Sequence, residues 1–191
     1  MRAFSWSDAH LIEALGETKP LVRMADGRRG QMSIAAYLEY LAAPERFSSS
    51  LGPAYLTDFP LFPSYGERGR EILAADIACP LPRREPMAEW ITLYAGPTGT
   101  ATFLHQDVFS TNTWLANLRG EKRWRVCAPT SFTAPDASVD LFGEADIRDV
   151  QVFDALLGPG DLIYLPPDWW HQVRNERGPS MALSGSLRSW I

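Results

Sequence analysis

The stretch FLHQDVFSTNTWLANLRGEKRW, from Phe103 to Trp124, decides how this sequence is interpreted. It places His105 two residues before Asp107 and continues with a pattern typical of a strand, a tight turn and a second strand, with Lys122 just past the turn. Residues two apart on a strand project from the same face, so His105 and Asp107 can converge on one point. A lone His-x-Asp triplet is more often part of a surface loop, so the rest of the sequence must decide.

The sequence changes character at Glu89. From there, short segments rich in aromatic and β-branched residues alternate with turn signals. These segments are EWITLYAG, TATFLHQDV, TNTWLANL, KRWRVCAP, DLIYLPP, WWHQVRN and SMALSGSL. Strands that follow one another without intervening helices predict an antiparallel jelly-roll barrel.

The N-terminal part is predicted to be helical and rich in loops. Ser7 precedes DAHLIEALG and Ser33 precedes IAAYLEYLAAP, and each serine is a typical N-cap for the amphipathic helix that follows. A short strand is expected around Tyr55. We therefore predict a mainly β single domain over residues 1–191, in which flanking N-terminal helices and loops (1–88) cover a jelly-roll core (89–191).

Bulk composition excludes several classes of function. The 191 residues contain 23 acidic and 18 basic side chains, a net charge of -5, which gives no reason to attract nucleic acid. No apolar run is long enough to span a membrane, and MRAFSWSDAH lacks the apolar core of a secretion signal. Cys79 and Cys127 show no paired spacing. We therefore expect a cytoplasmic protein with no nucleic-acid or membrane partner.

A third metal ligand is available at His171. The chain has three histidines, and His10 falls in the first predicted helix, whereas His171 follows a Pro-Pro corner in GDLIYLPPDWWHQV. Two histidines and one carboxylate leave three coordination positions open, which suits Fe(II) in oxygenases because a cosubstrate and dioxygen can bind together. The hydroxyl of Thr102 and the ammonium of Lys122 are what a 2-oxoacid with a distal carboxylate requires.

These motifs together carry a resemblance. The segment LYAGPTGTATFLHQDVFSTNTWLANLRGEKRWRVCAP, followed by GDLIYLPPDWWHQVRN, resembles the JmjC, or cupin-like, family of Fe(II)- and 2-oxoglutarate-dependent oxygenases. The resemblance covers roughly the C-terminal half. The spaced residues Trp114, Asn117, Gly120, Lys122 and Trp124 are especially similar to the small hydroxylase branch, which includes lysyl and asparaginyl hydroxylases. A cupin-like double-stranded β-helix is the fold that this resemblance implies.

The resemblance also implies roles for individual residues. It assigns Fe(II) to His105, Asp107 and His171. It pairs Lys122 with the distal carboxylate of the cosubstrate 2-oxoglutarate, helped by the hydroxyl of Thr102. Without the three ligands, Lys122 beside a turn would be interpreted as a solvated surface charge.

Three more side chains are candidates for the cosubstrate site. Tyr55 stands where related hydroxylases carry a tyrosine that reaches the same carboxylate, and Ser184 falls near a polar position that faces the cosubstrate. Asn117, on an expected inward-facing strand, is either a structural hydrogen-bonding residue or a contact to cosubstrate or substrate. Trp114 and Trp124 are expected in the core.

The resulting prediction is an O2-consuming dioxygenase that hydroxylates an amino-acid side chain in a protein, a peptide or a small biosynthetic intermediate. One alternative is a catalytically inactive metal-binding cupin that serves as a binding or structural module. Others are an iron-dependent cupin that uses no 2-oxoglutarate, and an N-demethylase that uses the same oxidant. The resemblance also makes a homodimer an expectation, without direct support from the residues.

Overall fold

The computed structural model describes residues 1–47, 52–61, 67–73, 76–77, 86–133, 139–143 and 149–187. Its α-helices are α1 (Asp8–Leu15), α2 (Ile34–Ala42) and α4 (Glu67–Leu73). Its 3-10 turns are η1 (Arg2–Ser5), η2 (Pro44–Arg46), η4 (Val108–Ser110) and η5 (Pro129–Ser131). Within these ranges, no helix is long and apolar enough to cross a membrane.

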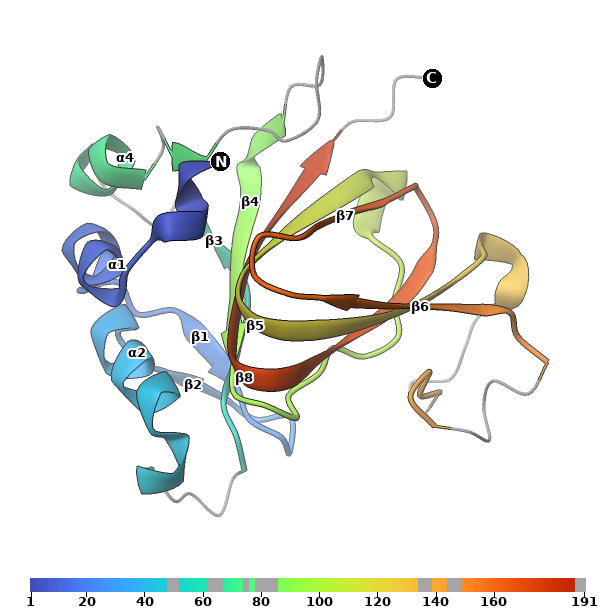
Figure 1. The fold of residues 1–191 in the computed structure, drawn as a ribbon, viewed down its shortest axis with the longest axis horizontal. Coiled ribbons are helices and arrows are strands. Elements are labelled where there is room, and N and C mark those ends of the chain that lie inside the picture. Colours follow the sequence, from blue (N-terminus) through green and yellow to red (C-terminus); the bar gives the residue numbers. More distant parts are fainter. Residues whose placement is uncertain are drawn as a thin grey trace.

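The strands make one antiparallel sheet that curls on itself. They are β1 (Leu21–Arg23), β2 (Arg29–Gln31), β3 (Tyr55–Pro60), β4 (Pro86–Gly96), β5 (Asn112–Cys127), β6 (Val152–Leu157), β7 (Leu162–Leu165) and β8 (Trp170–Leu187). The order is β2-β1-β3-β4-β8-β5-β6, and β7 pairs with β5. Figure 1 shows β5 and β8 curving together, with the helices on one side and β6 and β7 on the other. The predicted jelly-roll class is confirmed.

The two predicted N-terminal helices are also confirmed. The Ser7 hydroxyl accepts a hydrogen bond from the His10 amide at 3.2 Å, and the Ser33 hydroxyl accepts one from the Ala36 amide at the same distance. Each serine therefore satisfies one of the free N–H groups at the start of its helix. The strand expected around Tyr55 is β3, which lies between β1 and β4 in the sheet.

Several strand assignments need correction. TNTWLANL and KRWRVCAP form one bent strand, β5, instead of a hairpin, because Gly120 takes a φ of 66° that changes the strand's direction without reversing it. WWHQVRN and SMALSGSL likewise form the single strand β8. TATFLHQDV forms only isolated bridges at Ala101 and His105. The β1–β2 hairpin, which turns at Gly27 with a φ of 84°, and the edge strand β6 were not predicted.

Two apolar cores lie on the two faces of the sheet. One packs the apolar faces of α1 and α2 against β3, β4, β5 and β8, and it includes Leu11, Leu38 and Trp114. The other fills the barrel and includes Leu115, Trp124 and Val173. Both predicted core tryptophans are buried, on opposite faces. Cys127 is a buried free thiol, and Cys79 lies outside the described residues.

Candidate metal and cosubstrate site

Two segments far apart in sequence place the two histidines directly opposite each other. The His105 amide donates to the His171 carbonyl at 3.1 Å, and the His171 amide donates back to the His105 carbonyl at 2.9 Å. Residues opposite each other in an antiparallel bridge project to the same side. Their ring centroids are accordingly 4.1 Å apart. The irregular segment before η4 therefore brings His105 to the mouth of the barrel against the start of β8.

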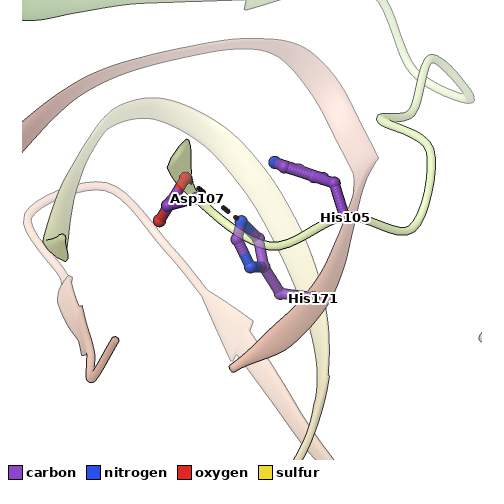
Figure 2. Close-up of side chains that lie close together, drawn as sticks. All are labelled: His105, Asp107 and His171. Carbon is purple, nitrogen blue, oxygen red and sulfur yellow. Dashed lines mark ion pairs between the residues drawn. The ribbon is translucent and has the colours of Figure 1, made fainter. Parts of the chain in front are cut away.

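Asp107 completes the cluster. One of its carboxylate oxygens, Oδ1, lies 3.9 Å from Nε2 of His171, and one possible ligand atom from each of the three residues lies within 4.8 Å of the others. Figure 2 shows the three side chains converging from the two segments. Two ligand atoms that each lie about 2.0–2.2 Å from one ion are at most about 4.4 Å apart, and the 3.9 Å between Asp107 and His171 is within this limit. The spacing therefore fits a single ion.

Backbone carbonyls orient both imidazole rings. Nδ1 of His105 lies 2.8 Å from the Phe103 carbonyl oxygen, and Nδ1 of His171 lies 3.1 Å from the Trp169 carbonyl oxygen. A carbonyl only accepts, so in the neutral form of each ring Nδ1 carries the proton and Nε2 has the lone pair. Carbonyl partners of this kind orient histidine ligands in metal sites.

The environment keeps His171 neutral. Burial first, and then the neighbouring His105, lower the pKa of its imidazole to about 4, although Asp107 and the hydrogen bond to the Trp169 carbonyl act in the opposite direction. The contact between Asp107 and His171 therefore joins a carboxylate to a neutral ring at pH 7. A metal ion requires a neutral imidazole, so the ring is already in the form that binds it.

Lys122 is a fully buried cation without an acidic partner among the described residues. Its Nζ donates one hydrogen bond, to Oδ1 of Asn175 at 2.6 Å, and lies 5.7 Å from the centre of the Tyr55 ring. Burial lowers the pKa of its ammonium to about 7. An ammonium has three donors, so two remain for a ligand. Interpretation as a solvated surface charge is therefore wrong, because the side chain has no exposed surface.

One pocket contains the three candidate ligands and most of the candidate cosubstrate residues. Its wall includes Lys122, Thr102, Tyr55 and Ser184. The Thr102 oxygen accepts from the Val173 amide at 3.0 Å, so its own O–H can still donate. The Ser184 hydroxyl donates to the Trp114 carbonyl at 3.1 Å, which leaves its oxygen as an acceptor.

Asn117 is not brought to this pocket. It is fully buried, and its side-chain amide donates to the carbonyls of Gly120 at 2.7 Å and Leu157 at 3.2 Å. The sequence left Asn117 as either a structural hydrogen-bonding residue or a ligand contact. This geometry matches the structural role, because the amide connects the bend of β5 to β6.

Sequence reasoning missed several residues in or next to the pocket. Asn175, which orients Lys122, donates in turn to the Thr100 hydroxyl at 2.7 Å, and Tyr94 and Thr113 contribute to the pocket wall. The alternation His171, Val173, Asn175 along β8 was the available signal, because these residues share one face. No sequence signal pointed to Thr113, because the face of the sheet on which it lies depends on where β5 bends.

The donors and charges fit iron and a dicarboxylate cosubstrate. Three ligand atoms with a buried ammonium nearby match an Fe(II) site with open positions and an anion-binding end. Thr113 Oγ1 and Trp124 Nε1 are buried pocket atoms without a hydrogen-bond partner among the described residues. Because an unsatisfied buried polar group is costly, these two atoms also call for a polar ligand.

Comparison with known proteins gives one family. The family model for the JmjC domain matches residues 83–191. The chain is 30% identical to Jumonji C domain-containing protein 5 of Drosophila melanogaster over 68% of this chain and 35% of that protein. It is 27% identical to Lysine-specific demethylase JMJ30 of Arabidopsis thaliana, over 87% of this chain and 39% of that protein.

A third relative is named for its cofactors. The 2-oxoglutarate and iron-dependent oxygenase JMJD4 of Mus musculus is 29% identical over 44% of this chain and 23% of that protein. The chain thus spans between 23% and 39% of the length of these three relatives. With more than half of its length matched by the family model and its strands arranged as a jelly roll, the chain belongs to the JmjC domain family.

Proposed function

We propose that this protein is an Fe(II)- and 2-oxoglutarate-dependent oxygenase that hydroxylates an amino-acid side chain in a protein, a peptide or a small biosynthetic intermediate. One observation carries the proposal: three metal-ligand side chains and a buried ammonium without an acidic partner among the described residues line the same pocket. An iron site alone would not require the ammonium. An anion site alone would not require two histidines with free Nε2 lone pairs.

Different side chains of the pocket would bind the metal and the cosubstrate. His105, Asp107 and His171 would hold Fe(II), and Lys122 and Thr102 would hold a carboxylate of 2-oxoglutarate. When bound, iron, 2-oxoglutarate and dioxygen supply an oxidant that hydroxylates a C–H bond and release succinate and carbon dioxide. The protein orients the reactants and excludes water with the apolar walls of the barrel, and no side chain need act as a general base.

Demethylation is the second candidate function. The relative JMJ30 is named a lysine-specific demethylase and matches 87% of this chain. N-demethylation would use the same oxidant and differ only in which C–H bond the substrate presents. The similarity to the small hydroxylase branch in the run from Trp114 to Trp124 favours hydroxylation.

A direct test measures succinate formation and oxygen uptake with Fe(II) and 2-oxoglutarate. We expect both to depend on iron and to be lost in His105→Ala, with His10→Ala on α1 as the matched histidine control. Absence of both signals in the wild-type protein would favour the inactive binding module. If iron binds and 2-oxoglutarate does not perturb the metal's visible spectrum, the cupin that uses no 2-oxoglutarate would be favoured.

The substrate can be sought by mass spectrometry. Amino acids, peptides and proteins are incubated with the loaded enzyme and searched for a gain of one oxygen. Loss of a methyl group with release of formaldehyde would indicate demethylation instead. His105→Ala identifies products that do not depend on the metal site.

A further inference from the structure

A groove beside the β1–β2 hairpin continues from the mouth of the metal pocket. The mouth is a second pocket, and its wall shares three residues with the metal pocket, among them His105. The groove in turn shares Arg23 and Asp58 with the mouth and extends to Arg29 on β2. A long substrate that reaches the metal through the mouth can therefore occupy the groove as well. The proposed iron and 2-oxoglutarate sites use none of these groove residues.

Two arginines lie directly opposite each other at the end of this hairpin. Arg23 of β1 pairs with Arg29 of β2 in the antiparallel register, and both side chains line the groove. Residues paired in this way project to the same side with their Cβ atoms about 5 Å apart, and like charges at such positions are destabilising. A guanidinium stays protonated near neutral pH, so loss of a proton does not relieve the repulsion. An anion bound between the two side chains would relieve it.

The described part of the chain supplies no counter-ion for the arginine pair. Among the described residues of the groove wall, Asp58 is the one with an acidic side chain, and its Oδ1 accepts from the Tyr94 hydroxyl at 2.7 Å. Neither arginine makes an ion pair with Asp58 or with another residue in the described ranges. The chain as a whole has a net charge of -5, so the groove is a basic site on an acidic protein.

Contacts to the neighbouring segment orient Arg23. Its Nη2 donates to the Ala101 carbonyl at 2.8 Å, and its guanidinium carbon lies 4.7 Å from the centre of the Phe103 ring. The hydrogen bond uses one of the five N–H donors of the guanidinium, so four remain for a ligand. Arg29 is exposed on β2 and adds a second set of donors. Each guanidinium matches a carboxylate, which can accept two parallel hydrogen bonds from it.

We propose that this arginine pair binds the carboxylates of an acidic polypeptide segment that flanks the residue to be oxidised. The proposal rests on the proposed oxygenase function and adds to it a second recognition site for the substrate. A free amino acid that fills the metal pocket would not extend through the mouth into the groove. An extended polypeptide advances about 3.3 Å per residue, so a few residues connect the two sites.

A binding test uses two matched octapeptides labelled with dansyl. One alternates glycine with glutamate, and the other alternates glycine with glutamine, so they differ only in charge. Their affinities are measured by anisotropy on Mn(II)-loaded protein, which needs no turnover. The glutamate peptide should bind about tenfold more tightly at low salt. Because the groove is open to solvent, this preference should fall below about threefold in about 0.5 M NaCl.

Variants of Arg29 separate its charge from a structural role. Arg29→Gln should reduce the preference for glutamate to nearly onefold, and Arg29→Lys should keep about threefold, because lysine retains the charge without the bidentate geometry. Arg29→Glu places opposite charges across the hairpin, so it should abolish binding without lowering the melting temperature. Arg46→Gln, at an exposed arginine on η2 outside the groove, is the matched control and should keep the full preference.

An oxidation test addresses the substrate itself. Two octapeptide libraries have random residues at every second position, and the positions between are all glutamate in one library and all glutamine in the other. After incubation with Fe(II) and 2-oxoglutarate, mass spectrometry measures the gain of one oxygen. The glutamate library should give about tenfold more oxidised product with the wild-type protein. The two libraries should give nearly equal amounts with Arg29→Gln.

Four results would overturn the inference. They are equal binding of the two octapeptides, an unchanged preference in Arg29→Gln, equal oxidation of the two libraries, and oxidation of free amino acids but of neither library. Tighter binding of a thymidine octanucleotide through the same arginine would also overturn it, in favour of nucleic acid. Failure of the wild-type protein to form succinate with Fe(II) and 2-oxoglutarate would instead overturn the proposed function. The anisotropy ratio would then still decide the role of the groove.

Discussion

Lys122 is the residue whose environment differs most from what its residue type suggests. A lysine just past a glycine turn normally extends into water, yet the Lys122 side chain is fully buried and donates a hydrogen bond to Asn175. Desolvation of a cation without a counter-ion destabilises the folded protein. A protein retains such a residue at a cost in stability when a ligand supplies the missing negative charge.

Lys122→Met should therefore make the ligand-free protein more stable and impair cosubstrate binding. Removing the buried charge is expected to raise the free energy of unfolding by about 1–2 kcal/mol, less the loss of the Asn175 hydrogen bond. Affinity for 2-oxoglutarate should fall about 10- to 100-fold. Thermal melting and calorimetric titration of Mn(II)-loaded protein measure the two effects. Lys19→Met, at the chain's other and exposed lysine, should change neither; equal effects in the two variants would contradict this role for Lys122.

The lowered pKa of Lys122 predicts proton uptake on cosubstrate binding. Its folded-state pKa of about 7 lies below the ordinary 10.5, so the ligand-free folded protein holds fewer protons than the unfolded chain between these values. Stability of the ligand-free protein should therefore rise with pH across this window. A bound carboxylate raises the pKa, so affinity should weaken by up to about tenfold per pH unit above 7.

Calorimetry in buffers of different ionisation enthalpy measures this uptake. At pH 8 the Mn(II)-loaded protein should take up about one proton per 2-oxoglutarate, and at pH 6 almost none. Because the metal is bound before the titration, protonation changes of the histidine ligands do not contribute to the measured proton uptake. Proton uptake that is the same at both pH values, or that survives in Lys122→Met, would assign the proton to another group.

At the scale of the element, β5 shows that the sequence pattern alone does not predict the face of the sheet on which each side chain lies. Leu115 and Trp124 both lie in the barrel core, although residues nine apart on a regular strand face opposite sides. Register shifts between Asn117 and Lys122 invert the alternation. Strand type was predictable from composition, but the face of each side chain was not, because it depends on pairing with the distant strand β8.

Gly120→Ala should destabilise the protein through this bend. An added Cβ would lie 2.8 Å from the Pro179 carbonyl oxygen and 2.8 Å from the Ser180 Cα, at a φ of 66°. Steric overlap and backbone strain together should lower the free energy of unfolding by about 2–4 kcal/mol in urea denaturation. Gly160→Ala, at a φ of 92° with nothing within 4 Å of its Cβ, isolates strain and should lose only about 1–2 kcal/mol. Equal losses would show that crowding at the bend does not matter.

At the scale of the whole molecule, local signals predicted helices and strands better than the site. The N-cap serines predicted α1 and α2, and the β-rich segments predicted the barrel. The three candidate ligands come together only because the segment around His105 pairs with β8, 66 residues further along the chain. Spacing in the sequence cannot establish such a contact. His171 was proposed because it is the one remaining histidine outside the first helix, and the family resemblance then supported the assignment.

Because the candidate ligands join two distant segments, metal binding should stabilise the entire fold. A ligand that binds only the folded state at 1,000 times its dissociation constant adds about 4 kcal/mol, or roughly 8–16 °C for a chain of this size. Thermal melts with Mn(II) and with EDTA measure the shift for each variant against its own metal-free form. His105→Ala should lose most of the shift and His10→Ala should keep it, since His10 lies on α1 and outside the cluster. A shift that both variants keep would place the metal elsewhere, and a shift that both lose would show that the two histidines act through general destabilisation instead of coordination.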